Sequence, residues 1–206
     1  MIKKQTIFFC IFLSCSFAYS DEWVVPGPQE FYSQNGLYCL VIKPSIIPDT
    51  DHRKVGKRSA KSEKYNSKKK QDSIVPCHAI LYKTGENYPD WTVLWERDLE
   101  NPVSPYKAFV TNDGKYVVSF DDWYHLGKGE NVMVVYGNNG ELLRKFELNE
   151  ITSLSDDQLK VSVTSIWWYQ GVESYSEDPA RIVILVKDKN FNIEKRIFNL
   201  DELKFE

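Results

Sequence analysis

Short apolar runs separated by turn residues recur through most of the chain, and this spacing decides its fold class. The clearest turns are Asn-Asp-Gly at 112–114 and Asn-Asn-Gly at 138–140, each between two apolar runs. Asn, Asp and Gly tolerate the positive φ of tight turns, so this arrangement is a strong signal for β-hairpins. The sequence therefore predicts an all-β chain of antiparallel hairpins. The expected strands are 37–42, 77–82, 91–95, 108–111, 116–120, 132–136, 142–146, 161–169, 181–186 and 193–198.

The expected strands fall into three sets that look like copies of one unit. Each set closes with a strand of mixed charge that runs into a leucine, at Leu99, Leu148 and Leu200. Repeated antiparallel meanders build the blades of β-propellers, and a closed propeller typically has about four to eight blades. Three units leave three architectures open: an open propeller-like stack, a twisted sandwich of the same hairpins, or a fragment that closes by oligomerising.

The segment 149–160 departs from the strand pattern. Its residues 155–158, Ser-Asp-Asp-Gln, resemble a capping box, and the two acids are placed to favour a helix N-terminus. We therefore expect one short helix or helical turn near 150–160, joining the second set of strands to the third.

One block in the second set carries a family resemblance. It reads Phe-Val-Thr-Asn-Asp-Gly-Lys-Tyr-Val-Val-Ser-Phe-Asp-Asp-Trp at 109–123, then Gly-Lys-Gly-Glu-Asn-Val at 127–132 and Val-Tyr-Gly at 135–137. The block resembles the core signature of uncharacterised exported bacterial proteins with propeller-like β repeats. The resemblance is limited to about residues 108–148 of the 206. It implies a secreted β-repeat protein and brings no catalytic motif with it.

The first 20 residues have the layout of a signal peptide. Lys3 and Lys4 form a charged start, residues 7–13 are apolar, and Ala18 and Ser20 are the small residues that precede a cleavage site. The apolar run is much shorter than the ~20 residues that a membrane-spanning helix needs. We therefore expect cleavage after Ser20 and export to the periplasm or the extracellular space, with no transmembrane span in the mature chain.

A lipid anchor is the alternative for this leader. Leu13-Ser14-Cys15 partly matches a bacterial lipoprotein cleavage box, which would attach the mature chain to lipid through Cys15. In either case, we expect residues 21–206 to form a single β-repeat domain.

Removal of the leader would leave Cys39 and Cys77 as the two cysteines of the chain. Two thiols in an oxidising compartment are more often paired than free, so the sequence predicts a Cys39–Cys77 disulfide. The bond would close a loop of about 38 residues, which in the loop-entropy model stabilises the fold by about 3–4 kcal/mol. Two buried, unlinked thiols are the alternative.

The net charge of −3 conceals a strongly basic stretch. Between Asp51 and Asp72, nine Lys or Arg accompany three Asp or Glu, whereas the rest of the chain after residue 20 has a net charge of −11. Since this stretch is nearly devoid of apolar residues, we expect a disordered loop at about 50–74. It could bind a polyanion such as lipopolysaccharide, nucleic acid or anionic lipid, associate with the acidic body, or be a solvated insertion. The candidate polyanion-binding residues are Arg53, Lys54, Lys57, Arg58, Lys68, Lys69 and Lys70.

Two clusters are candidate binding sites for a protein or glycan at the cell envelope. The first, Asp121, Trp123 and His125, lies at the end of a predicted strand, where functional groups often sit. The second, Trp167, Trp168 and Tyr169, should direct at least one large ring away from the core if it is a strand. The structural alternatives are that the acids cap a loop and that both faces of the strand are buried.

Catalytic and metal-binding motifs are weak. There is no Gly-x-Ser-x-Gly elbow, and the chain's three histidines, His52, His78 and His125, lack ligand spacing. The sequence therefore predicts an exported, non-enzymatic binding protein with no cofactor and no metal. A cell-envelope hydrolase that uses the 121–125 loop is the alternative.

Overall fold

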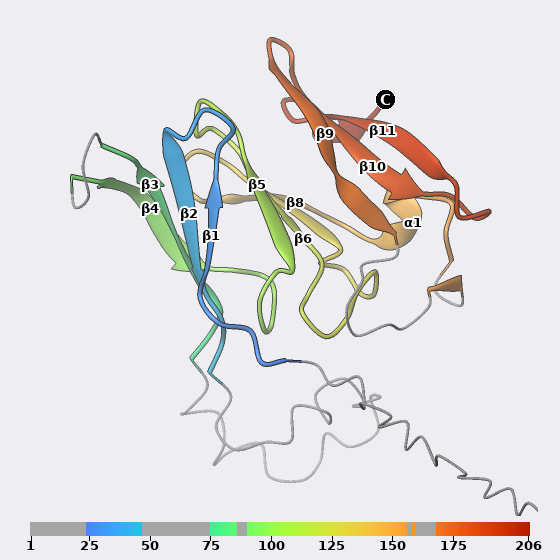
Figure 1. The fold of residues 1–206 in the computed structure, drawn as a ribbon, viewed down its shortest axis with the longest axis horizontal. Coiled ribbons are helices and arrows are strands. Elements are labelled where there is room, and N and C mark those ends of the chain that lie inside the picture. Colours follow the sequence, from blue (N-terminus) through green and yellow to red (C-terminus); the bar gives the residue numbers. More distant parts are fainter. Residues whose placement is uncertain (1–23, 47–74, 86–89, 156–157, 160–167) are drawn as a thin grey trace, which may run out of the picture.

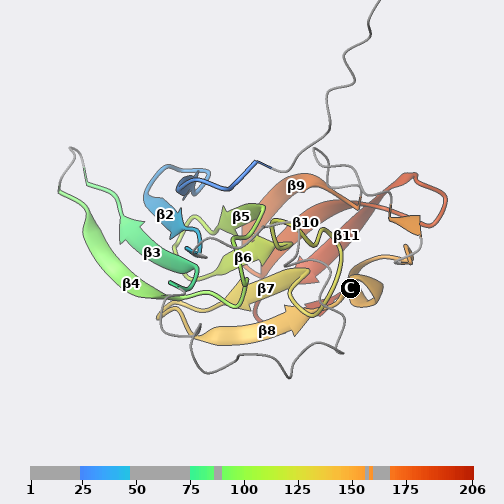
Figure 2. The same ribbon diagram turned by 90° about the horizontal axis from the view of Figure 1, so that it is seen from below.

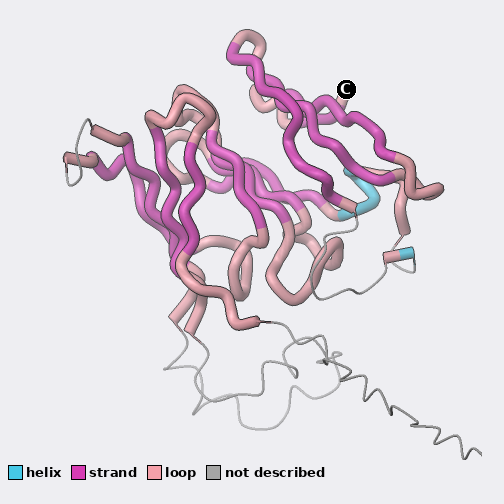
Figure 3. The backbone as a smooth tube through the Cα atoms, in the orientation of Figure 1, coloured by secondary structure: helices cyan, strands magenta, loops and turns pink. Residues whose placement is uncertain are grey.

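The computed structural model describes residues 24–46, 75–85, 90–155, 158–159 and 168–206. Within these residues the chain forms three antiparallel sheets, each a meander of four consecutive strands (Figure 1). Strands are the main regular secondary structure of the described backbone, and helix is confined to short pieces (Figure 3). The predicted all-β class, built from antiparallel meander repeats with one short helix, is confirmed.

The first sheet contains β1 (Gln29–Tyr32), β2 (Tyr38–Lys43), β3 (His78–Lys83) and β4 (Thr92–Asp98). The middle sheet contains β5 (Lys107–Val110), β6 (Val117–Phe120), β7 (Met133–Tyr136) and β8 (Leu142–Phe146). The third sheet contains β9 (Tyr169–Glu177), β10 (Ala180–Lys187), β11 (Ile193–Asn199) and β12 (Lys204–Phe205). The sequence did not predict β1 or β12. The strand expected at 161–169 is described only from Tyr169 onward, as β9.

The middle sheet lies between the other two and is covered on both faces (Figure 2). Alternate residues of its central strands point to opposite faces. We call the contact with the first sheet the first seam and the contact with the third sheet the second seam. The first seam contains Leu40, Ile42, Cys77, Ala79, Leu81, Trp95, Leu99, Val110, Val117, Val134 and Tyr136. The second seam contains Tyr116, Val118, Phe120, Val132, Met133, Val135, Phe146, Leu148, Ile151, Leu154, Trp168, Ala180, Ile182, Ile184, Val186, Phe198 and Leu200.

Two hairpin glycines of the middle sheet make the first seam possible. Gly114 and Gly140 have φ of 70° and 75°, as the predicted turns require. A Cβ on Gly114 would overlap the ring of Tyr38, and one on Gly140 would lie 2.9 Å from the ring of Trp95. These turns therefore need glycine twice, for the backbone conformation and for the close approach of an aromatic ring from the first sheet.

The short helix α1 (Leu148–Ile151) begins two residues before the expected range of 150–160 and ends before Ser155, and a different pair of residues caps it. Glu147 and Glu150 form a reciprocal capping box, with the Glu147 amide donating to Glu150 Oε2 at 2.9 Å. Leu148 and Ile151 are buried in the second seam, so the helix adds apolar surface there.

The predicted Cys39–Cys77 disulfide is wrong, because both residues are buried free thiols. In the β2–β3 register Cys39 pairs with Tyr82, whereas Cys77 lies one residue beyond the His78 end of the ladder. Five residues of extended strand separate the two positions by about 16 Å, and a disulfide needs Cα atoms within about 7 Å. The residues that flank the basic segment are instead joined by an isolated β-bridge between Ile46 and Val75, with N···O distances of 2.9 and 3.2 Å.

Several predicted features lie outside the described residues. They are the signal peptide at 1–20, Cys15, the basic loop at 50–74, Trp167, and the residues Arg53, Lys54, Lys57, Arg58, Lys68, Lys69 and Lys70.

Candidate functional site

The loop that follows β6 contains the first predicted cluster. The chain turns out of the middle sheet at Asp121, which has a φ of 58°. Asp is one of the few residues that adopts this left-handed conformation readily. The Asp121 amide donates to the Val132 carbonyl at 2.8 Å, so the turn stays attached to the start of β7.

The Asp121 carboxylate is fully buried in the second seam. It accepts hydrogen bonds from the Gly127 amide and from Trp168 Nε1, the latter at 2.7 Å. Burial raises the pKa of Asp121 to about 8, although both donors favour the ionised form. The carboxylate therefore links the loop to the start of the third sheet, and it does not reach solvent.

Asp122 points to the other side of the loop. Its Oδ1 accepts from the amides of Val103 and Ser104 at 3.1 and 3.4 Å, and its Oδ2 lies 3.2 Å from His125 Nδ1. Of the two adjacent carboxylates, only that of Asp122 reaches His125. The Asp122 side chain is 5% exposed and that of His125 is 32% exposed, so the imidazole is the accessible member of the pair.

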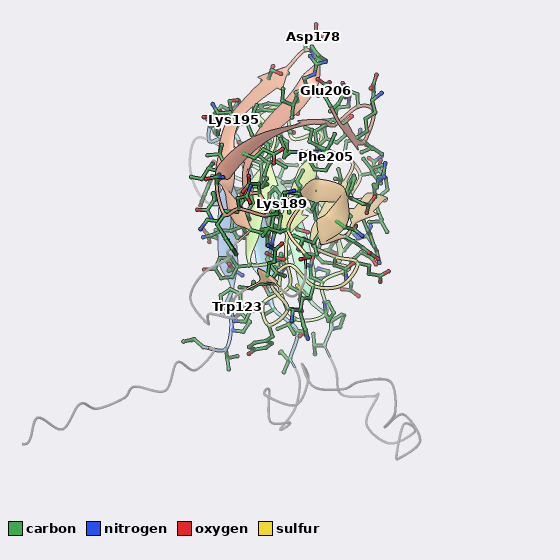
Figure 4. All side chains as sticks on the ribbon, turned by 90° about the vertical axis from the view of Figure 1, so that its right-hand side faces the viewer. Trp123, Asp178, Lys189, Lys195, Phe205 and Glu206 are labelled. Atoms are coloured by element: carbon green, nitrogen blue, oxygen red, sulfur yellow. The ribbon has the colours of Figure 1, made fainter. Side chains whose placement is uncertain are left out.

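Trp123 attaches the N-terminal segment to this loop. Its indole donates to the Val24 carbonyl at 2.7 Å, and its ring lies 5.4 Å from the ring of Tyr106 at an angle of 33°. Figure 4 places Trp123 at the opposite end of the molecule from Asp178. The residue is half-buried, and its one polar group is already used within the chain.

The second predicted cluster is largely internal. Trp168 is fully buried, and Tyr169 is half-buried with its ring stacked on Phe120 at 4.4 Å. Burial raises the pKa of Tyr169. Trp168 is therefore not available as a binding residue, because its side chain packs against the middle sheet, and Trp167 lies outside the described residues.

The structure reveals an aromatic surface that the sequence did not indicate. Tyr32, Tyr82 and Trp91 gather on the face of the first sheet that points away from the middle sheet, with centroid distances of 6.3 Å (Tyr32–Trp91) and 5.7 Å (Tyr82–Trp91). Tyr32 is 51% exposed and Val93, which pairs with Tyr82, is 50% exposed. We call this surface the first outer face. The signal in the sequence for this surface was the pair of tryptophans at 91 and 95. Only the folded sheet shows that Trp91 lies on the first outer face and Trp95 in the first seam.

The third sheet also has an outward face, which we call the third outer face. Its apolar side chains are Val183, Leu185, Ile193 and Ile197, which alternate with residues of the second seam along β10 and β11. Ile193 is 63% exposed and Ile197 is 39% exposed. In Figure 4 the third sheet faces the viewer and carries Lys195 and Glu206.

No protein-family model and no curated protein matches this chain. Within the described residues, no group of three His, Cys, Asp or Glu is placed to hold a metal ion. A search of the same residues finds no helix with the length and apolar character needed to cross a membrane.

Proposed function

We propose that this chain is an exported, non-enzymatic interaction protein that binds other proteins through its first and third outer faces. The observation that carries the proposal is the exposure of large apolar side chains on two outward sheet faces, led by Tyr32, Val93 and Ile193. Contiguous exposed apolar patches on soluble proteins commonly mark interaction sites.

The chemistry of these faces favours a protein partner over a glycan. Aromatic rings suit either ligand, because sugars stack on flat rings and Tyr and Trp anchor protein interfaces. Here the rings of the first outer face adjoin the aliphatic side chain of Val93, and the apolar side chains of the third outer face are all aliphatic. Burial of aliphatic surface against other apolar side chains favours association, and a protein partner supplies such side chains.

Neither carboxylate of the 121–125 loop supports the hydrolase alternative. The Asp121 carboxylate is buried against Trp168, and the Asp122 carboxylate holds two backbone amides and His125. A general base needs an accessible lone pair aimed at a substrate proton. Both acids organise the loop instead.

Site-specific photo-crosslinking tests the proposal. A photoreactive side chain would replace Glu96 on the first outer face, Lys195 on the third, or Glu130 in the loop before β7 as the control. The side chains of Glu96 and Glu130 are similarly exposed, at 64% and 69%. In envelope extract or medium of the producing cells, we expect protein adducts from positions 96 and 195 and none from 130. Adducts from all three positions, or from none, would overturn the proposal.

The exported location has its own test. We expect the recovered protein to begin at Asp21. A lipid-modified Cys15 at the N-terminus would establish the anchored alternative, and an intact Met1 in the cytosol would contradict export.

Polyanion binding by the basic segment stays a prediction from its charge. We expect retention on heparin resin that weakens with salt and is lost when residues 53–70 are deleted. The Ile46–Val75 bridge lies outside the deletion, so the β2–β3 hairpin should survive it. Unchanged retention would exclude the segment as the binding site.

A further inference from the structure

The geometry points to a second copy of this chain as the occupant of both outer faces. The first outer face of one copy packs against the third outer face of the other, and two such contacts close a ring of six sheets. This inference rests on the proposed function, because it names the partner of the same two surfaces.

The chain already repeats one packing step. The first sheet packs on the middle sheet, and the middle sheet packs on the third, so only the two terminal faces lack a neighbouring sheet among the described residues. The first strands of the three meanders, β1, β5 and β9, lie next to one another in chain order. β1 lies beside β5 (Figure 1), and the ring centroids of Phe109 in β5 and Tyr175 in β9 are 5.7 Å apart. A third outer face placed on a first outer face would continue this step from one copy to the next.

The two faces match in polarity. The first outer face has a row of apolar and aromatic side chains on β2, β3 and β4, in which Val41 and Tyr82 are half-buried, Val93 is 50% exposed and Ile80 is buried. The third outer face has its aliphatic row at Val183, Leu185, Ile193 and Ile197. Both rows run across several strands, as do the rows that fill the two seams inside the chain.

The two faces are also complementary in charge. On the first outer face, Glu30, Glu96 and Asp98 accompany the single cation Lys43 and a histidine, His78. On β9 to β11 of the third outer face, Arg181, Lys187 and Lys195 accompany the single acid Glu173. Arg181 and Lys195 hold ion pairs of 2.7 Å with Glu206 and Glu173. Opposite local charge favours contact between unlike faces and disfavours contact between like ones.

The area is sufficient for a stable dimer. Four strands spaced about 4.8 Å apart, with an average length of about 20 Å, present a face of roughly 400 Å². Two copies that use both faces bury four of them, roughly 1,600 Å² in all, which is the size of a standard stable protein interface. A single unlike contact buries only about half of that, so closure stabilises the ring.

Because the contact joins two different faces, each copy keeps one unused face until a ring closes. A contact between two different surfaces produces an open filament unless its rotation closes a ring. Two three-sheet copies make six sheets, which lies within the range of about four to eight blades in closed β-propellers.

The test measures the mass in solution of the mature chain, residues 21–206, by light scattering. We expect the mass of two chains. Val93→Asp on the first outer face and Ile197→Asp on the third should each weaken association by at least about 100-fold, because a charge is buried against apolar surface. Leu142→Asp is the matched control, since Leu142 of β8 is 38% exposed and Ile197 is 39% exposed. A monomeric mature chain at about 100 µM, or a control variant that also dissociates, would overturn the inference.

Mapping a crosslink keeps the inference testable if a variant fails to fold. A photoreactive side chain at position 96 of the purified chain should form a two-chain adduct with peptides of residues 181–199 of the other copy. An adduct within residues 78–98 would indicate contact between like faces and would overturn it. If the purified chain forms no self-adduct but position 96 still captures another protein, this inference fails while the proposed function stands.

Discussion

The two seams of the middle sheet differ in how they are built, although they share the strands β6 and β7. The second seam holds seventeen buried apolar residues among the described part of the chain, and the first holds eleven. The second seam also contains α1 and the buried Asp121–Trp168 hydrogen bond. The first depends on two turn glycines that admit Tyr38 and Trp95. Neighbouring sheets of the same repeat can therefore be held together in two ways. One is a large set of buried apolar side chains, and the other is the close approach of aromatic rings to the backbone of turn glycines.

The largest effect is expected in the second seam. Phe120 is fully buried and its ring stacks on Tyr169 at 4.4 Å. Phe120→Ala should lower the free energy of unfolding by about 3–5 kcal/mol, because it removes apolar contact and leaves a cavity. Urea unfolding followed by circular dichroism measures the loss. A loss below about 1 kcal/mol would mean that the second seam is not packed in solution.

Trp168→Phe tests the polar link within the same seam. The folded chain holds a proton on Asp121 up to its raised pKa of about 8, whereas the unfolded chain releases it near pH 4. The stability that protonated Asp121 contributes is therefore present below about pH 4 and is lost as the pH rises toward 8. Removal of the indole donor leaves the carboxylate short of a partner, so the destabilisation should be larger at pH 8, about 3 kcal/mol, than at pH 5.

Asp121→Asn provides the control for that measurement. In this background the loss caused by Trp168→Phe should no longer depend on pH, because the titrating group is gone. A loss in the original background that is equal at pH 5 and pH 8 would contradict the role of Asp121.

Adjacent residues of β6 compare the two seams directly. Val117 faces the first seam and Val118 faces the second, and both are buried. Val117→Ala and Val118→Ala should each cost about 2 kcal/mol, from the lost apolar volume. If the three sheets form one cooperative unit, both variants shift a single unfolding transition. A second transition that only Val117→Ala moves would show that the first sheet unfolds separately.

The smallest effect is expected from reductant. Cys77 lies in the first seam and Cys39 lies on the opposite face of the first sheet, so no disulfide supports either side. Burial raises the pKa of Cys77 to about 12 and also raises that of Cys39. Reductant should leave the unfolding curve unchanged, and two thiols should react only after denaturation. Fewer than two reactive thiols in the denatured, oxidised protein would restore the disulfide.

Local sequence patterns predicted the strands and turns better than they predicted the candidate binding residues. The turns at 112–114 and 138–140 and the strands around them were predictable, because turn chemistry and alternation act between near neighbours. The sequence placed Asp121 in the candidate site with His125, whereas the structure pairs Asp122 with His125 and buries Asp121 against Trp168. The orientation of Trp168 was not predictable, because two adjacent tryptophans offer no local reason for one to be buried. The first outer face was missed since Tyr32, Tyr82 and Trp91 meet only across the sheet.

The sequence by itself determined that this chain folds into antiparallel meanders, because each hairpin is specified by residues close together in the chain. Only the tertiary structure decided which faces of the meanders are buried. Strands β6 and β7 are covered on both sides, whereas β10 alternates between buried and half-buried residues. Tertiary structure also placed Cys39 and Cys77 apart, through the β2–β3 register. These outcomes depend on contacts between segments far apart in the chain, where sheet packing selects the partner and local pattern does not.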